Sequence, residues 1–199
     1  MSEIFEYRGI EGLVYAELLE DTQETLTYGE VKPLCGVATL SRTTESSSEA
    51  HYYDNIPAVV IASTGADEVT IGVSAVPFDV LADITGQHYD ETLGAFVEGE
   101  RESKYFAIGY KTAKTNGDEV YVWRYKGTFG IPDSEHNTQD DGTEATGQEL
   151  TFTGINTTHK FVKTGKTAKA LNVDLGKELA DVSTFFETVT TIDDLKAKA

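Results

Sequence analysis

Short runs of alternating apolar and polar residues, rich in Val, Ile, Thr and aromatic side chains, recur along most of this 199-residue chain. Clusters of Gly, Asn, Asp and Ser separate the runs, as is typical of antiparallel β proteins. We therefore expect a mainly β protein, built as an antiparallel β-sandwich. The expected strands cover residues 13–19, 37–41, 58–63, 69–75, 105–112, 119–129, 149–153 and 160–164.

The clearest local signal is the Asn116-Gly117 pair between two of these runs. Both residue types tolerate positive φ, which a two-residue type I′ hairpin turn requires. Such a turn places Tyr110 opposite Trp123. One face of this hairpin is then polar and basic and includes Arg124. The other is predicted to be an aromatic core face, formed by Phe106, Ile108, Tyr110, Tyr121, Trp123 and Tyr125.

Two segments have helical patterns. Pro77 and Gly86 bracket a short apolar stripe, which predicts one helix lying on the sheet. A second stripe follows a possible Asp174 cap and predicts a helix in a C-terminal arm. Its members are Leu175, Leu179, Val182 and Phe186. The expected organisation is a β-sandwich domain over residues 1–171 and an arm, possibly helical, over residues 172–199.

Two polar stretches are expected to be exposed loops. The stretch 43–50 reads TTESSSEA, and the stretch 130–148 has no credible strand. The second stretch is nineteen residues long, and structureless loops of that length are uncommon inside a compact domain. We expect such a loop to become ordered when a neighbouring subunit covers it.

The chain carries 34 acidic and 16 basic residues, a formal net charge of −18 at pH 7. This argues against a protein that grips nucleic acid, which needs clustered Lys and Arg. Residues 1–100 hold nineteen acidic and three basic residues, whereas residues 150–173 hold four lysines and no acid. The pattern fits either an ordinary solvated surface or contact between the basic segment of one copy and the acidic surface of another. The candidate assembly residues are Lys160, Lys163, Lys166, Lys169, Asp133, Glu135, Asp140, Asp141 and Glu144.

Residues that could carry catalysis form no recognisable constellation. The four histidines are far apart, and none has a second ligand at the spacing of a zinc site. The single Cys35 lies in an apolar stretch typical of a buried, inert thiol. No Gly-x-Ser-x-Gly, Walker or dinucleotide-binding motif is present. We therefore expect no enzyme, no metal and no cofactor. No apolar run approaches the ~20 residues that span a bilayer, so we expect no membrane anchor.

Four stretches, in this order along the chain, resemble a known family. They are YYDNIPA at 52–58, VPFDVLADITG at 76–86, the pair KYFAIGY and YVWRYKGTF at 104–110 and 121–129, and QELTFTG at 148–154. The sequence resembles the major tail protein (tail tube protein) family of long-tailed siphophages that infect Gram-positive bacteria. The resemblance covers about residues 10–165 and leaves the C-terminal arm outside it.

The resemblance implies a β-sandwich flanked by a helix, with copies joined edge to edge into hexameric rings that stack into a tube. It implies a structural virion protein of the tail, made in the host cytoplasm, without catalysis. Its partners would be other copies of itself, a tape-measure protein and tail-end proteins. Double-stranded DNA would pass through without specific binding, and an acidic channel wall would repel its phosphates.

An alternative is a carbohydrate- or receptor-binding sandwich of a phage tail, in which Tyr52, Tyr53 and Tyr89 stack on sugars. Tyrosines of β-rich chains are more often half-buried strand residues. The sequence leaves open which strand edges would form a ring, the number of subunits, the state of the free subunit, the host and the role of the arm at 172–199.

Overall fold

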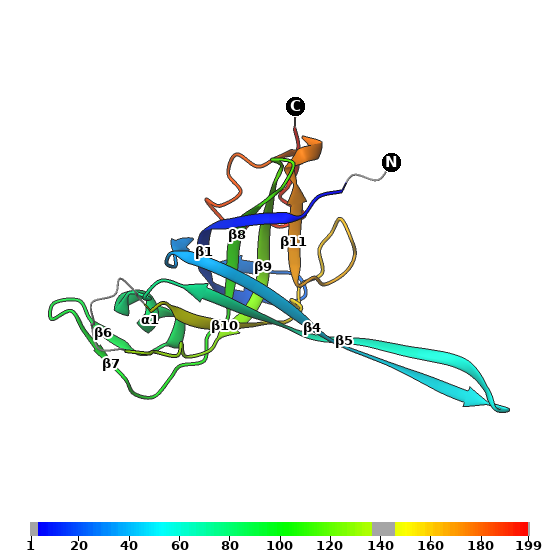
Figure 1. Ribbon diagram of the computed structural model, residues 1–199, viewed down its shortest axis with the longest axis horizontal. Helices are drawn as coiled ribbons and strands as arrows, with labels where there is room; N and C mark the ends of the chain where they lie inside the picture. The colour runs from blue at the N-terminus through cyan, green and yellow to red at the C-terminus, as the bar shows by residue number, and fades with distance from the viewer. Residues whose placement is uncertain (1–3, 137–145, 199) are drawn as a thin grey trace.

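The computed structural model of the chain describes residues 4–136 and 146–198 and shows a β-rich body from which a long hairpin projects (Figure 1). Within these ranges nine strands form one antiparallel sheet, ordered β2-β1-β8-β9-β10-β5-β4, with β3 paired to β1 and β11 to β9. These strands are β1 (Tyr7–Asp21), β2 (Leu26–Tyr28), β3 (Lys32–Pro33), β4 (Val37–Tyr53), β5 (Ile56–Val73), β8 (Phe106–Lys114), β9 (Glu119–Phe129), β10 (Gln148–Gly154) and β11 (Ala170–Asp174). The expected mainly β, antiparallel, sandwich-like fold is confirmed.

The expected helix at 77–86 is confirmed as α1 (Phe78–Thr85). It ends at Gly86, whose left-handed φ of 68° suits a residue without a side chain. Ala82 and Ile84 are buried, so the apolar side of the helix packs on the body. After α1 the chain forms a separate small sheet from β6 (His88–Asp90) and β7 (Ala95–Val97).

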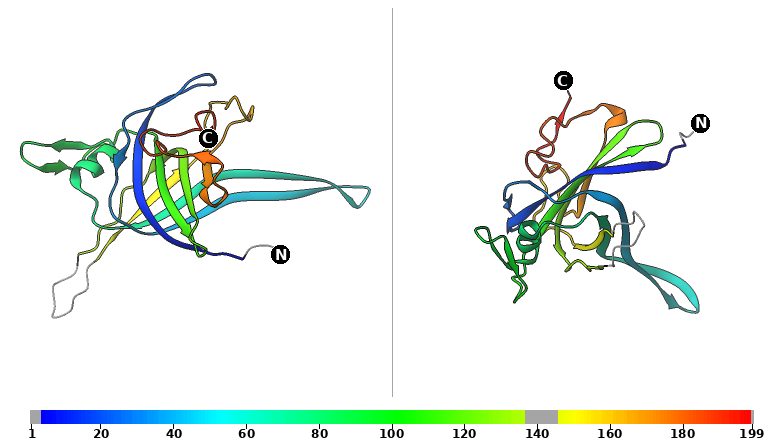
Figure 2. Two further views of the ribbon diagram at one scale, coloured as in Figure 1. Left: turned by 90° about the horizontal axis from the view of Figure 1, so that it is seen from above. Right: turned by 60° about the vertical axis from the view of Figure 1, so that its left-hand side comes forward.

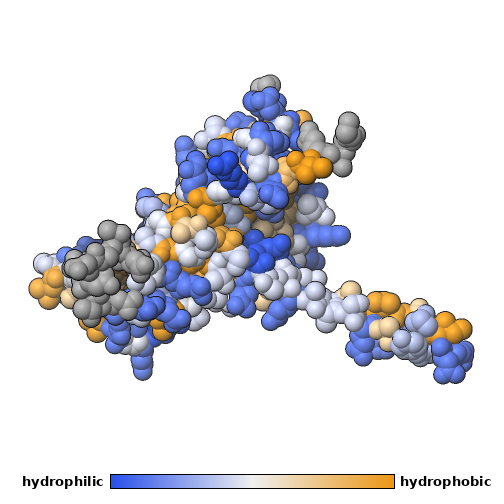
Figure 3. Space-filling model, viewed as in Figure 1, coloured by the Kyte–Doolittle hydropathy of each residue, from blue (hydrophilic) through white to orange (hydrophobic). Residues whose placement is uncertain are grey.

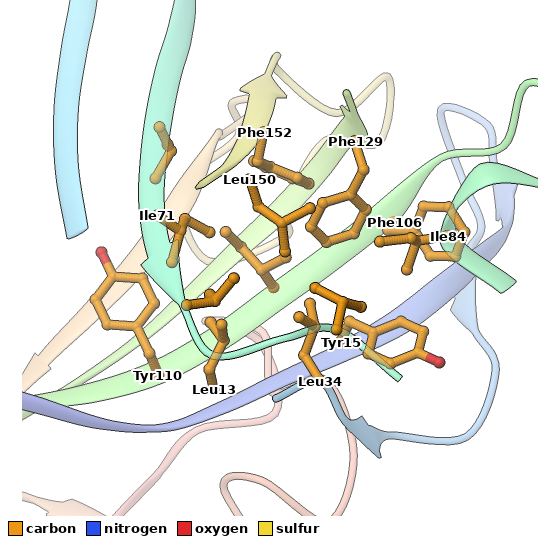
Figure 4. Close-up of a cluster of buried hydrophobic side chains, with 14 of the residues drawn as sticks. Leu13, Tyr15, Leu34, Ile71, Ile84, Phe106, Tyr110, Phe129, Leu150 and Phe152 are labelled. Carbon is orange, nitrogen blue, oxygen red and sulfur yellow. The ribbon is translucent and has the colours of Figure 1, made fainter. Parts of the chain in front are cut away.

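The larger hydrophobic core lies on one face of the curled sheet (Figure 4). Strands β1, β5, β8 and β10 contribute to it through Leu13, Ile71, Phe106 and Leu150, all buried. Ile84 adds the helix to the same core. Because residues from so many strands converge, the sheet wraps around this core rather than lying flat on it.

A second core covers the opposite face of β8 and β9. Trp123 and Tyr125 of β9 are buried there beneath Phe161, Phe185 and Val189 from the C-terminal part of the chain. The Trp123 indole N–H donates a hydrogen bond of 2.8 Å to the Phe185 carbonyl oxygen. Strand β9 is therefore buried on both faces.

The β8–β9 hairpin forms where expected, but its predicted register is wrong by one residue from the turn to Ile108. Beyond a bulge, Phe106 lies opposite Gly127, as the predicted register requires. The turn contains three residues, because the Lys114 N–H bonds to the Asp118 carbonyl and the Gly117 N–H to the Lys114 carbonyl. Gly117 alone takes a left-handed φ, of 94°, whereas a type I′ turn requires positive φ at Asn116 as well. The Asn116 side chain instead accepts the Asp118 N–H at 3.1 Å, which favours the three-residue turn. Tyr110 consequently lies opposite Val122 rather than Trp123.

This shift of one residue divides the predicted aromatic face between the two cores. Phe106, Ile108 and Tyr110 belong to the first core, whereas Tyr121, Trp123 and Tyr125 belong to the second. Arg124, predicted on a polar exposed face, is buried. The prediction failed because it assumed that one face of the hairpin is solvated, and here both are covered.

The expected loop at 43–50 is also wrong, because these residues continue β4. Strands β4 and β5 pair without interruption by a loop, from Val37 opposite Val73 to Tyr53 opposite Ile56. The two strands expected at 58–63 and 69–75 are thus parts of the single strand β5. Their outer halves form the projection at the right of Figure 1.

The C-terminal part differs from its predicted secondary structure. Within the described residues, the helix expected after Asp174 is limited to the 3₁₀ helix η1 (Leu175–Lys177), which Asp174 caps through the Gly176 N–H. Turns and the short pair β12 (Ala180–Asp181) and β13 (Lys196–Ala197) follow. Tertiary packing of Phe185 on β9 overrides the weak helical preference. In place of the strand expected at 160–164, residues 162–165 form a turn between the bridged residues Phe161 and Lys166, and β11 was not expected.

Candidate functional site

The outer part of the β4–β5 hairpin, residues 45–65, is the most unusual feature of the surface. From here on we call it the arm, and residues 172–199 are called the C-terminal part of the chain. Each of these residues is exposed. Asp54 and Asn55 form the tip, with φ values of 51° and 64° that fit a two-residue type I′ turn. Seen from above, the arm extends well away from the body (Figure 2). The arm is a bare two-stranded ribbon, an element that is at best marginally stable by itself in water.

Apolar side chains are exposed on the arm, as they also are in patches on the body (Figure 3). Ile56 and Val60 are each 64% exposed, and Ile61 is 56% exposed. Because residues opposite each other in a pair of strands share a face, the paired Ala50 and Val60 lie on the same side of the ribbon. Ser47 and Ser63 form a polar cross-strand pair nearer the body, with oxygens 2.7 Å apart. Val60 and its strand neighbour Ile61 point to opposite faces, so the arm presents exposed apolar side chains on both faces, and no described residue covers them.

The backbone N–H and C=O groups along the two outer edges of the arm are also free to form hydrogen bonds with another strand. β4 ends the strand order of the main sheet, so its outer edge lacks a pairing strand in the described structure. β10 pairs with β5 only from Asp67 to Val73, so the outer edge of β5 along the arm is also free. Free strand edges pair readily with other chains.

A charged cluster lies where the arm joins the body. Asp67 accepts hydrogen bonds from Lys169 Nζ at 2.9 Å, Thr44 Oγ1 at 3.0 Å and Arg124 Nη1 at 3.1 Å. Arg42 Nη1 lies 3.6 Å from the same carboxylate. Burial acts to raise the pKa of Asp67, but the hydrogen bonds from Lys169 and Thr44, together with the charges of Lys169 and Arg124, outweigh burial and lower it. The cluster therefore holds an ionised carboxylate among three cations.

The four candidate lysines separate into two groups. Lys163 Nζ donates to the carbonyls of Ile192 and Leu195 at 2.8 and 2.7 Å, and Lys169 bonds to Asp67 and to the Gly65 carbonyl. These two lysines bond within the chain, and a role for any of the four in assembly stays a prediction. The side chains of Lys160 and Lys166 form no ion pair within the described part of the chain. Both residues are exposed.

Among the acidic candidates, Asp133 forms no ion pair with any of the four lysines in the described part of the chain. The backbone of Asp133 forms an isolated antiparallel β-bridge with Glu149 of β10. Glu135 follows two residues later in the chain and is exposed. The lysine segment instead packs toward the C-terminal residues, where the Asp193 carboxylate accepts the Lys163 N–H at 2.8 Å. The remaining candidates, Asp140, Asp141 and Glu144, lie outside the described residues.

The three tyrosines of the sugar-binding alternative do not form one platform. Tyr52 and Tyr53 lie near the arm tip, 66% and 65% exposed, and as neighbours on a strand they point to opposite faces. Tyr89 is on β6, which lies across the body from the arm (Figures 1 and 2).

The single cysteine, Cys35, is partly buried. Burial raises the pKa of the Cys35 thiol to about 11, so the thiol stays protonated at neutral pH. Residues 4–136 and 146–198 contain no group of three or more His, Cys, Asp or Glu side chains that could hold a metal ion. The same ranges contain no helix of the length and hydrophobicity needed to cross a membrane.

Sequence reasoning missed the arm, although two signals were present. The run IPAVVIA at 56–62 has strong β propensity, and the Asp54-Asn55 pair is a type I′ turn sequence. The polar stretch TTESSSEA obscured both, because it resembles a loop. Comparison with known proteins finds no matching family model and no matching curated protein.

Proposed function

We propose that this chain is a structural subunit that assembles with copies of itself, and that the arm joins the copies. The observation that carries the proposal is the exposure of the apolar strand of the arm, with Val60 at 64% and Ile61 at 56%. A solitary protein gains nothing from holding such residues on a two-stranded ribbon in water. Contact with a second copy would bury them and pair the free backbone groups.

The most specific form of this proposal is a subunit of a phage tail tube. The resemblance to the major tail protein family supports it, and one of the four stretches that carry the resemblance, residues 52–58, falls at the tip of the arm. Copies would form hexameric rings that stack into a tube within the virion tail, beside tape-measure and tail-end proteins. The net charge of −18 supports a channel that repels DNA instead of binding it.

Negative-stain electron microscopy of concentrated purified protein tests the proposal. We expect rings about one subunit layer thick, or hollow rods made from stacked rings. Featureless single particles at every concentration, together with absence of the protein from mature virions, would contradict it.

A second candidate function is binding of carbohydrate or of a receptor by the arm tip, favoured by the exposure of Tyr52 and Tyr53. Their opposite directions limit any one flat ligand to a single ring. Binding of the monomeric protein to purified cell-wall polysaccharide, lost when both tyrosines are replaced by serine, would support this alternative. Retention of assembly in the same double variant would separate the two functions.

A further inference from the structure

Two hollows meet where the arm joins the body, and Arg42, Arg124 and Asn172 line both. The first, about 470 Å³, lies against the charged cluster and is also lined by Lys169. The second, about 520 Å³, lies among β1, β4, β8 and β9 and has an apolar wall that includes Val122. We call the two hollows together the arm-root site. An apolar cavity with a few convergent polar groups is the usual form of a binding site.

The arm-root site has an excess of positive charge. It contains the side chains of Arg42, Arg124 and Lys169, whereas Asp67 is the only acidic residue among the described residues that line it. Three cations thus face one carboxylate, in a chain whose first hundred residues carry nineteen acids and three bases. Two positive charges remain without a counter-charge inside the site.

Arg124 has unused hydrogen-bonding capacity. The residue is 6% exposed, and its two terminal nitrogens donate to Asp67 at 3.1 Å and to the Tyr110 hydroxyl at 3.3 Å. Its buried Nε–H has no hydrogen-bond partner in the described structure. A buried donor without an acceptor costs free energy, which an incoming acceptor would recover.

We propose that the arm-root site binds a carboxylate group, and that this group is an Asp or Glu side chain of a second copy of the chain. A guanidinium fork matches the two oxygens of a carboxylate. The acidic surface of the chain supplies complementary charge. The site is adjacent to the arm, so the copy that the arm contacts would lie against it. The identity of the occupant rests on the proposed self-assembly, whereas the carboxylate specificity does not.

The first test uses the monomeric chain at low concentration, with ¹⁵N NMR detection of the Arg124 Nε–H signal. Titration with glutarate at constant ionic strength is expected to shift this signal in a saturable way. Arg42→Gln should weaken glutarate binding at least about fivefold, whereas the matched control Arg8→Gln, an exposed arginine outside the site, should not. No saturable shift, or tighter binding of inorganic phosphate or a short DNA duplex than of glutarate, would overturn the carboxylate site.

The second test follows assembly by light scattering. We expect glutarate to raise the protein concentration needed for assembly, and Arg42→Gln to raise it as well, with Arg8→Gln unchanged. Assembly that ignores both glutarate and Arg42→Gln would overturn the second copy as the source of the carboxylate. A wild-type chain that never assembles would overturn the proposed function and this occupant, while the NMR titration would still decide whether the site binds carboxylates.

Discussion

Gly109 of β8 lies directly opposite Trp123 of β9, and the Trp123 ring covers the position where a side chain on Gly109 would be. A Cβ atom there would approach Trp123 Cζ3 and Val14 Cγ2 to 2.9 Å. The three residues form one row across β1, β8 and β9. This row fixes how closely the second core packs on the sheet.

Gly109→Ala is therefore expected to destabilise the fold by about 1–3 kcal/mol, because the added methyl group overpacks the row. Chemical denaturation followed by Trp123 fluorescence measures the change. Gly99→Ala is the matched control, since a Cβ at Gly99 meets nothing within 4 Å. Equal stability of the two variants would show that the Trp123 ring moves aside without cost.

Asp21 anchors the segment before β11 to the body. Its carboxylate bonds to Lys126 Nζ at 2.6 Å and to the backbone N–H of Thr158 and His159 at 2.8–2.9 Å. Burial acts to raise the pKa of Asp21, but these bonds outweigh burial and lower it. Asp21→Asn is expected to cost about 3 kcal/mol at pH 7, because it leaves Lys126 largely buried without its partner.

The lowered pKa also predicts a pH dependence. The unfolded chain takes up a proton at Asp21 at a higher pH than the folded chain does, so the stabilising contribution is complete above the ordinary Asp value of about 3.9 and is lost as pH falls through the folded value. Stability measured between pH 6 and pH 2 should fall less steeply in Asp21→Asn than in wild type. Glu11→Gln, which removes an exposed pair with Lys111, should leave the slope unchanged. Parallel curves for wild type and Asp21→Asn would contradict the assignment.

Val60 provides the most direct single-residue test of the arm surface. Val60→Glu should raise the concentration for half-assembly by at least about tenfold, because a carboxylate in an apolar contact loses its hydration. Val97→Glu, at an exposed valine of β7, should leave assembly unchanged. Circular dichroism checks that both variants fold. Normal assembly of Val60→Glu would exclude this face of the arm from the contact.

Lys160 and Lys166 remain candidates for contact with an acidic neighbour. Replacing both with Glu is expected to weaken assembly by roughly threefold to tenfold at low salt, with a smaller difference at high salt because exposed charges are screened. Lys177→Glu with Lys196→Glu, two exposed lysines elsewhere, is the control. An identical loss in both double variants would mean that only net charge matters.

The sequence predicted the parts of the fold that depend on neighbouring residues. Pro77 and Gly86 mark α1 correctly, and β9 has the predicted bounds at Glu119 and Phe129. The hairpin register failed because the turn has three residues instead of two, and the predicted aromatic face failed because alternation cannot reveal a sheet covered on both faces. Only the structure shows that Phe185 returns from the C-terminal part to cover Trp123.

The candidate site was less predictable, because it depends on contacts between distant residues. Lys169 contacts Asp67 and Lys163 contacts Ile192, pairings that no local pattern reveals. The arm was missed because of its local sequence, and not because of contacts between distant residues. Its polar strand, with the stretch TTESSSEA, has the composition of a loop.

Sedimentation velocity across a wide concentration range tests the central claim most directly. It compares wild type with a variant in which residues 45–66 are replaced by Asn-Gly, which joins the paired residues Thr44 and Asp67 by a two-residue turn. The account predicts that wild type forms large species as concentration rises, while the armless variant folds and stays monomeric. A wild type that remains monomeric throughout, or an armless variant that assembles equally well, would contradict it.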